Sequence, residues 1–245
     1  MKLWIGLAAL VLAEIGYPLT EGRARAALVV VTVCLGFLLS IAHAAATRGP
    51  RAAGLLALVT AGGGFAVEAA GRATGYPFGD YDYTGALGPR LLGVPLVIPL
   101  AWTWMAWPAW VAAARLTSRP VARIAVAAVG LAAWDLFLDP QMVSQGYWLW
   151  RTTTPALPGV DGIPLTNYLG WLAVALALMA LLRLALGDDP ARPGADAPMY
   201  AMYLWTYTSS ILAHGIFLGL PASAAWGAAG MGLVAIPLAV RLWRR

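Results

Sequence analysis

Long apolar blocks alternate with short polar stretches along the whole chain. Each block has roughly 17–24 residues, the length that a helix needs to cross the hydrocarbon layer of a membrane. The pattern therefore predicts an all-α fold, a polytopic transmembrane helix bundle of about eight spans that forms a single integral membrane domain over residues 1–245. The expected spans cover residues 3–19, 24–46, 52–70, 91–114, 121–138, 165–186, 199–220 and 222–242.

The amino-acid composition also indicates a membrane protein. Of the 245 residues, 61% are hydrophobic and 11% are charged, which is more apolar than a soluble domain of this size needs. The net charge of +5 requires no nucleic-acid partner, because membrane proteins keep Lys and Arg in their cytoplasmic loops. Eleven of the 16 Lys and Arg residues, Arg244 and Arg245 among them, fall on the side of the predicted bundle that holds both termini. We expect a multi-pass protein of the plasma membrane with both termini in the cytoplasm.

The stretch 134–150 carries two acids at the end of an apolar run. Asp135 and Asp139 are four residues apart, about one helical turn, so both carboxylates share one face of a helix. A charged side chain at bilayer depth costs about 2.5–3.5 kcal/mol on insertion scales, so such residues are typically functional. Pro140 disfavours helical backbone at the residue before it, and we expect the helix to end or kink at Asp139.

The predicted topology places most polar residues of the spans in the outer half of the membrane. The two long connections, residues 71–90 and 140–164, lie on the same side. This grouping predicts one shared, partly dry cavity in the outer half of the bundle. The spans contribute Glu14, Glu68, Asp135, Asp139, Asn167 and His214, and the connections contribute Asp80, Tyr81, Asp82, Tyr83, Trp148 and Trp150.

A short internal repeat relates two parts of the chain. The sequence Gly-Val-Pro-Leu precedes Trp102, and Gly-Ile-Pro-Leu precedes Trp171 at the same spacing. Each copy follows an acid near a helix end, Glu68 in one case and Asp135 in the other. Two copies of one helical hairpin, related by an axis along the membrane normal, would place these acids face to face.

Several motifs together resemble those of the CruF-type carotenoid hydratases, a family of integral membrane carotenoid-biosynthesis proteins of bacteria and archaea. The resemblance covers a motif core of about residues 68–171. It implies addition of water to the terminal carbon–carbon double bond of an acyclic (psi) carotenoid end, giving a tertiary alcohol without a redox cofactor. The motifs are Gly-Asp-Tyr-Asp-Tyr from Gly79, Gly-Val-Pro-Leu-Val-Ile-Pro-Leu-Ala-Trp up to Trp102, Asp-x-x-x-Asp-Pro-Gln-Met-Val from Asp135, Gly-Tyr-Trp-x-Trp from Gly146 and Gly-Ile-Pro-Leu-Thr-Asn-Tyr-x-Gly-Trp up to Trp171.

The candidate residues also suit acid-catalysed hydration on chemical grounds that do not depend on the resemblance. A proton adds to the less substituted alkene carbon and water captures the tertiary cation, so the site needs an acid, a base and aromatic faces. We predict Asp135 as the acid and Asp139 or Glu68 as the base, with Asp82 as a further catalytic candidate. The predicted substrate-binding residues are Tyr81, Tyr83, Asp80, Trp102, Trp148, Trp150, Asn167, His214 and Glu14. The expected substrate is lycopene or a monocyclic or elongated derivative, with membrane lipid and other carotenoid enzymes as partners.

No metal or other cofactor is expected. Cys34 is the single cysteine, and His43 and His214 fall at different depths, so neither a thiol–metal nor a bis-histidine site is predicted. Residues 187–198 are expected to form a cytoplasmic linker.

Two other kinds of activity stay open at this stage. Buried acids with a His also suit a proton-coupled membrane transporter, although acids gathered in one leaflet do not line a path to both faces. Within carotenoid chemistry, a cyclase begins with the same protonation but excludes water. A prenyl-transferring elongase needs a second Asp-rich motif to hold a magnesium diphosphate, and the cytoplasmic side shows no convincing one.

Overall fold

The computed structural model describes residues 1–244, and Arg245, one of the basic residues in the orientation argument, lies outside them. Within the described residues the chain forms eight continuous helical segments, of which six are long and apolar enough to cross a membrane. The expected all-α membrane bundle is confirmed. In chain order the segments are α1 (Lys2–Gly16) with η1 (Tyr17–Leu19), α2 (Gly22–Arg48), α3 (Pro50–Ala57) with η2 (Leu58–Gly62) and α4 (Gly63–Thr74), α5 (Ile98–Leu116), α6 (Pro120–Ala132) with α7 (Asp135–Ser144), α8 (Leu165–Leu186), α9 (Ala197–Leu212) with η3 (Ala213–Phe217), and α10 (Pro221–Trp243).

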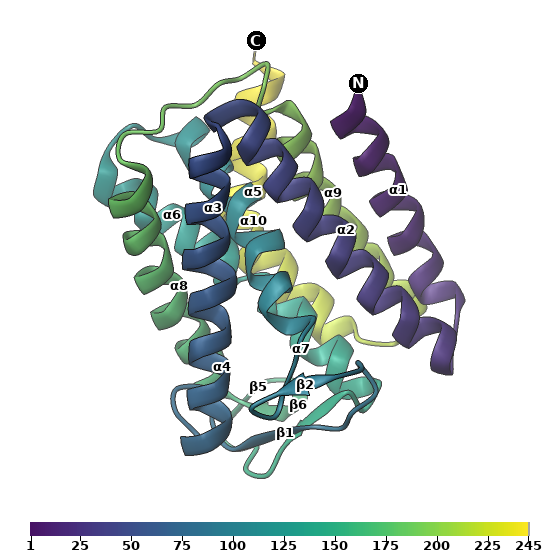
Figure 1. Ribbon diagram of the computed structural model, residues 1–245. Coiled ribbons are helices and arrows are strands. Elements are labelled where there is room, and N and C mark those ends of the chain that lie inside the picture. The colour runs from purple at the N-terminus through teal and green to yellow at the C-terminus, as the bar shows by residue number, and fades with distance from the viewer. Residues whose placement is uncertain (245) are drawn as a thin grey trace.

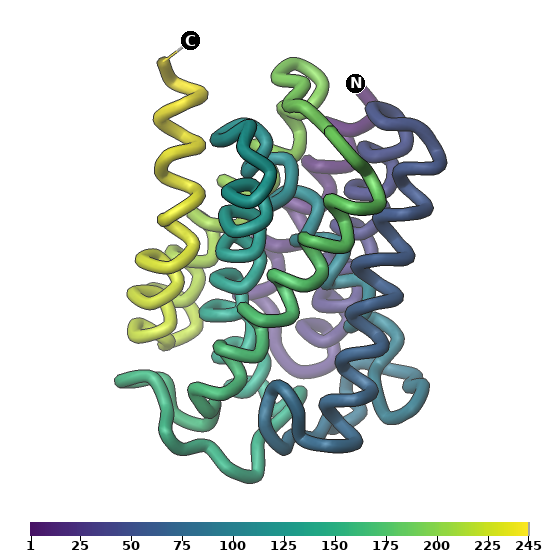
Figure 2. The backbone as a smooth tube through the Cα atoms, turned by 90° about the vertical axis from the view of Figure 1, so that its left-hand side faces the viewer, coloured from purple at the N-terminus to yellow at the C-terminus, as the bar shows by residue number. Residues whose placement is uncertain are grey.

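Helix α5 lies in the middle of the bundle, packed against α2, α6 and α9. Nearly all of its side chains are buried, including four tryptophans spaced along the helix, Trp102, Trp104, Trp107 and Trp110. A helix that is apolar on every side is typically buried on every side. Both termini lie at one end of the bundle, and the strands and the two long connections lie at the other (Figures 1 and 2).

The fourth helix begins later than the apolar pattern predicts. It starts at Ile98 instead of residue 91, because β2 (Arg90–Leu91) and β3 (Val94–Pro95) form a small antiparallel hairpin in front of it. Gly93, in the turn of this hairpin, has φ +82°, a left-handed conformation that ends any helix and that glycine adopts without steric cost. The apolar residues of this segment belong to a connection, not to a span.

The helix break near the acid pair also differs from the prediction. Pro140 lies inside α7, which continues to Ser144, and the interruption falls earlier, at residues 133–134 between α6 and α7. A proline has no N–H for the carbonyl four residues earlier, here that of Leu136. The Ser223 hydroxyl of α10 donates to this carbonyl oxygen at 2.7 Å, so α7 tolerates Pro140 without leaving a buried acceptor unpaired.

Short strands close the end of the bundle opposite the termini. β1 (Tyr81–Tyr83) pairs antiparallel with β4 (Trp148–Trp150), and β5 (Ala156–Leu157) pairs with β6 (Val160–Pro164). Successive side chains of a strand point to opposite faces. Tyr81 and Tyr83 therefore face the bundle and are buried, while Asp82 faces outward.

The segment predicted as a linker is held tightly against the other end of the bundle. Asp189 and Asp196, which lie between α8 and α9, are buried and form ion pairs with Arg48 and Arg123. The connection is therefore a packed part of the fold at this end.

Candidate active site

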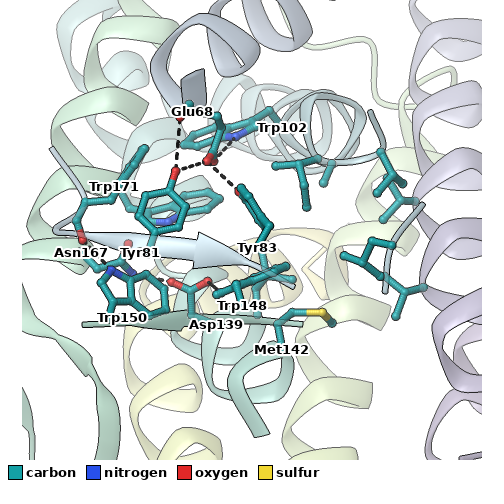
Figure 3. Close-up of a pocket in the computed structure, with 18 residues that line it drawn as sticks. Glu68, Tyr81, Tyr83, Trp102, Asp139, Met142, Trp148, Trp150, Asn167 and Trp171 are labelled. Carbon is teal, nitrogen blue, oxygen red and sulfur yellow. Dashed lines mark hydrogen bonds between the residues drawn. The ribbon is translucent and has the colours of Figure 1, made fainter. Parts of the chain in front are cut away.

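A cavity of about 40 Å³ lies where α4, α5, α7 and α8 meet the paired strands β1 and β4 (Figure 3). Its walls are mostly aromatic and aliphatic, with two acids and one amide among them. It is lined by Val29, Val33, Glu68, Phe78, Tyr81, Tyr83, Leu87, Val97, Ile98, Ala101, Trp102, Leu138, Asp139, Met142, Trp148, Trp150, Asn167 and Trp171.

Glu68 reaches the cavity from α4 and is held by three donors. The hydroxyls of Tyr81 and Tyr83 both donate to its Oε2, at 2.5 and 2.8 Å, and Trp102 Nε1 donates to Oε1 at 3.2 Å. Burial raises the pKa of both phenols, and the nearby Glu68 charge raises it further, so both tyrosines keep their protons as donors. Three donors and no acceptor around one carboxyl group stabilise its charged form and offset part of the cost of burying it.

Asp135 and Asp139 form a second acidic group, joined by an amide. Asn167 Nδ2 on α8 donates to Asp135 Oδ2 at 2.8 Å and to Asp139 Oδ2 at 2.5 Å. Trp148 Nε1 donates to Asp139 Oδ1 at 3.1 Å, while Asp135 Oδ1 has no partner among the described residues. The predicted shared helix face is confirmed, but only Asp139 lines the cavity, and Asp135 lies behind it with no exposed surface.

The two tryptophans of the internal repeat meet in the site. Trp102 and Trp171 stack with their ring centroids 4.0 Å apart and an interplanar angle of 12°. Trp102 fits there because Gly64 of α4 has no side chain, since a Cβ at this position would lie 2.6 Å from the indole. The spacing of the repeat thus brings equivalent residues into contact, and their flat faces form one wall of the cavity.

Four further aromatic side chains of the lining come from the paired strands. Tyr81 and Trp150 have ring centroids 5.6 Å apart, and Tyr83 lies edge-on to Trp148 at 5.5 Å. Trp150 Nε1 also donates to the backbone oxygen of Phe78 at 2.8 Å, which fixes its ring over the cavity. The pairing of β1 with β4 therefore holds these four aromatic side chains in place along the cavity.

Four of the predicted site residues lie elsewhere. Asp80 and Asp82 point away from the cavity and pair with Arg151, and Asp82 also pairs with Arg72 at 2.9 Å. Asp82 faces outward because successive side chains of β1 point to opposite faces, while Tyr81 and Tyr83 face the cavity.

Glu14 and His214 lie away from this cavity, nearer a second one. Glu14 accepts a hydrogen bond from Trp205 Nε1 at 2.5 Å. His214 is buried between Ser223 and Gln141, at 2.8 and 3.1 Å. The structure thus brings nine of the predicted residues together at one site, namely Glu68, Tyr81, Tyr83, Trp102, Asp135, Asp139, Trp148, Trp150 and Asn167.

Some lining residues were absent from the predicted site. Trp171 could have been included, because the repeat makes it the equivalent of Trp102. Phe78 and Met142 carry no comparable signal, since an isolated aromatic or methionine in an apolar chain usually fills the core.

The site is acidic and has no cationic partner. Among the described residues, neither Lys nor Arg lines the cavity, and no group of three or more His, Cys, Asp or Glu residues is arranged to hold a metal ion. A buried site with several acids and no cation cannot keep all of them ionised.

These features define a polytopic membrane protein with a buried carboxylate site walled by aromatic rings. The chain belongs to the family of carotenoid biosynthesis proteins, which it matches over residues 26–236. It is also similar to the bisanhydrobacterioruberin hydratase of Haloarcula japonica, with 32% identity over 154 residues. That alignment covers 57% of this chain and 51% of the relative, so it spans about half the length of the curated protein. Both findings agree with the resemblance to CruF-type carotenoid hydratases. No solved structure matches this chain.

Proposed function

We propose that this protein is a carotenoid hydratase, a hydro-lyase that adds water to the terminal double bond of an acyclic carotenoid end and yields a tertiary alcohol. The observation that carries the proposal is the pairing of an acid dyad with a separate, donor-stabilised carboxylate across an aromatic cavity. The hydratase named among its relatives supports the same chemistry. The substrate class, an acyclic carotenoid such as lycopene or an elongated derivative, is part of this proposal.

The dyad supplies the proton. Two buried carboxylates that share one amide donor repel each other when both are charged, so Asp135 and Asp139 hold one proton between them. Asp139 lines the cavity and is the member that can touch the alkene. We therefore assign the donor role to Asp139. The sequence favours Asp135 as the donor, but in this assignment it is the second member of the pair. Its charge raises the proton affinity of Asp139, and it returns a proton to Asp139 after the transfer.

Protonation begins the reaction. Asp139 gives its proton to the less substituted alkene carbon, a new C–H bond forms, and the π bond breaks to leave a tertiary cation. The stacked rings of Trp102 and Trp171 offer their faces to this cation, an interaction worth about 2 kcal/mol in a desolvated site. The ionised Glu68 carboxylate stabilises the same charge.

Water capture completes the reaction. The water oxygen bonds to the cationic carbon and its surplus proton passes to Glu68, which acts as the base. The product is the tertiary alcohol, and atoms and charge balance without an oxidant or reductant. The proton on Glu68 must then return to the dyad before the next turnover.

The rest of the substrate is a long polyene, which this cavity does not hold. We propose that it leaves between apolar side chains toward lipid. In the proposed setting the protein crosses the plasma membrane with both termini cytoplasmic, supported by the basic residues on that side. Other carotenoid enzymes would deliver the substrate and take the product.

Pigment analysis in a host that accumulates acyclic carotenoids tests the function. Expression of this chain should convert part of the pool into tertiary alcohols, identified by a mass gain of one water. A cyclised product of unchanged mass would instead favour a cyclase, and a chain lengthened by a prenyl unit would favour an elongase.

A further inference from the structure

A second cavity, of about 100 Å³, lies beside the proposed active site between α1, α2, α5, α7 and α9. Its lining is more polar than that of the first cavity. Glu14, Thr32, Gln141, Thr206, Ser209 and Ser210 all reach it. A cavity of this volume holds several water molecules, since each occupies about 30 Å³ in the liquid.

Three buried polar atoms of lining residues lack hydrogen-bond partners among the described residues. They are Tyr17 Oη, Trp104 Nε1 and Thr206 Oγ1, on side chains that are 6%, 6% and 3% exposed. An unpaired buried donor or hydroxyl costs about 1–3 kcal/mol unless a water molecule binds it. An apolar polyene cannot satisfy these groups, whereas water can.

The two cavities share one wall. Val29 and Val33 of α2 and Leu138 and Met142 of α7 line both of them. Leu138 directly precedes Asp139, so a molecule that passes this wall arrives beside the dyad. None of the four side chains carries a strong hydrogen-bonding group, so the wall holds no water of its own and separates the water of the second cavity from the alkene.

Gln141, which lines the second cavity, is held by a hydrogen-bond network behind the cavity wall. His214 lies 2.8 Å from Ser223 Oγ through Nδ1 and 3.1 Å from the side-chain oxygen of Gln141 through Nε2. Ser223 is held in turn by the Leu136 carbonyl. His214 is too far from the first cavity to contact a substrate there. Its structural role is to hold Gln141 at the wall of the second cavity.

We propose that the second cavity binds the water consumed in the reaction and delivers it past Leu138 and Met142 to the cation. This inference rests on the proposed hydration. It assigns Thr206, Ser209 and Gln141 to water binding, and it keeps bulk water away from the cation until the proton has been transferred.

Deuterated water separates the two steps. Protonation by an exchanged dyad puts deuterium on the alkene carbon, and a cation that meets no water loses a proton to Glu68 and returns as labelled alkene. The measured quantity is the ratio of labelled, recovered carotenoid to hydrated carotenoid, per unit of membrane-inserted protein. Wild-type protein should give mostly hydrated product.

The test variants change one helix position. Thr206→Leu fills the second cavity and removes a hydroxyl, and it should lower hydration by about 10–10²-fold while labelled alkene rises. Thr206→Val keeps the shape without the hydroxyl and should shift the ratio in the same direction but less. Thr208→Leu, two residues away on the exposed face of α9, is the matched control and should behave as wild type.

The outcomes distinguish failure of the water-supplying cavity from failure of the proposed hydratase function. Unchanged hydration in Thr206→Leu, or equal loss of hydration and labelling in both Thr206 variants at normal insertion, would contradict a water-supplying cavity. Wild-type protein that gives neither hydrated nor labelled carotenoid would instead contradict the proposed function.

Discussion

Two buried polar clusters lie at opposite ends of the bundle and are built in opposite ways. At the end that holds the termini, Asp189 accepts hydrogen bonds from Arg48 at 3.0 Å and from Arg123 at 3.2 Å, and Asp196 pairs with Arg48. Trp110 Nε1 donates to Asp189 as well, at 3.3 Å. Every acid in this cluster has a cation beside it.

At the strand end, the three buried acids have no cation beside them. Glu68, Asp135 and Asp139 receive only neutral donors, from tyrosine, tryptophan and asparagine side chains. Neutral donors can stabilise one carboxylate but cannot neutralise three buried ones. Charge pairing therefore fixes a connection in place at one end, while the proposed proton transfer at the other end depends on the lack of such pairing.

The largest expected effect comes from the donor at the strand end. Asp139→Asn keeps the shape but removes the transferable proton, and hydration should fall by about 10²–10⁴-fold at normal membrane insertion. The measurement is hydrated carotenoid per unit of inserted protein. Asp82→Asn, whose side chain faces outward, serves as the control and should stay near wild type. A greater loss in Asp135→Asn than in Asp139→Asn would transfer the donor role to Asp135.

At the other end, substitution should affect stability and leave the chemistry intact. Asp189→Asn leaves Arg48 and Arg123 without their shared acid, and breaking a buried pair costs about 3–5 kcal/mol in the free energy of unfolding. Thermal unfolding in detergent measures the change. Asp188→Asn is the matched control, because the neighbouring Asp188 side chain is 91% exposed. Loss of activity per folded molecule in Asp189→Asn would show that the two clusters are not separate in function.

A smaller effect is expected from the donors around Glu68. Tyr83→Phe removes one hydrogen bond to a charged acceptor, worth about 1.5–3 kcal/mol, so the hydration rate should fall roughly 10–10²-fold. Burial raises the pKa of Tyr83, so the phenol stays protonated as pH rises through the usual tyrosine range, near 10. The hydration rate of wild-type protein should therefore not fall near pH 10 through loss of the Tyr83 proton. A rate in Tyr83→Phe equal to wild type would mean that Glu68 needs no such donor.

Local patterns in the sequence account for much of this picture. Block length predicts the eight helical segments, and helical period places Asp135 and Asp139 on one face, since both depend on neighbours in the chain. The alternation of β1 is local too, but three residues inside the long connection 71–90 are too short a run to predict a strand. The sequence therefore predicts Asp82 beside Tyr81 and Tyr83, although it faces the other way.

Contacts between distant segments account for what the sequence does not reveal. Pro140 stays inside α7 because Ser223, far along the chain, bonds to the Leu136 carbonyl. The burial of Asp189 depends on Arg48 and Arg123 from two other helices. No local pattern encodes either contact. The sequence also does not show which of Asp135 and Asp139 lines the cavity, because the packing of the helices decides this.

The source of the oxygen atom tests the central claim most directly. Membranes containing this protein should be given an acyclic carotenoid in heavy-oxygen water, without molecular oxygen and without an added reductant. The account predicts a tertiary alcohol whose hydroxyl carries the heavy oxygen, formed by wild-type protein and lost in Asp139→Asn. An alcohol that forms only after molecular oxygen or a reductant is supplied would contradict it.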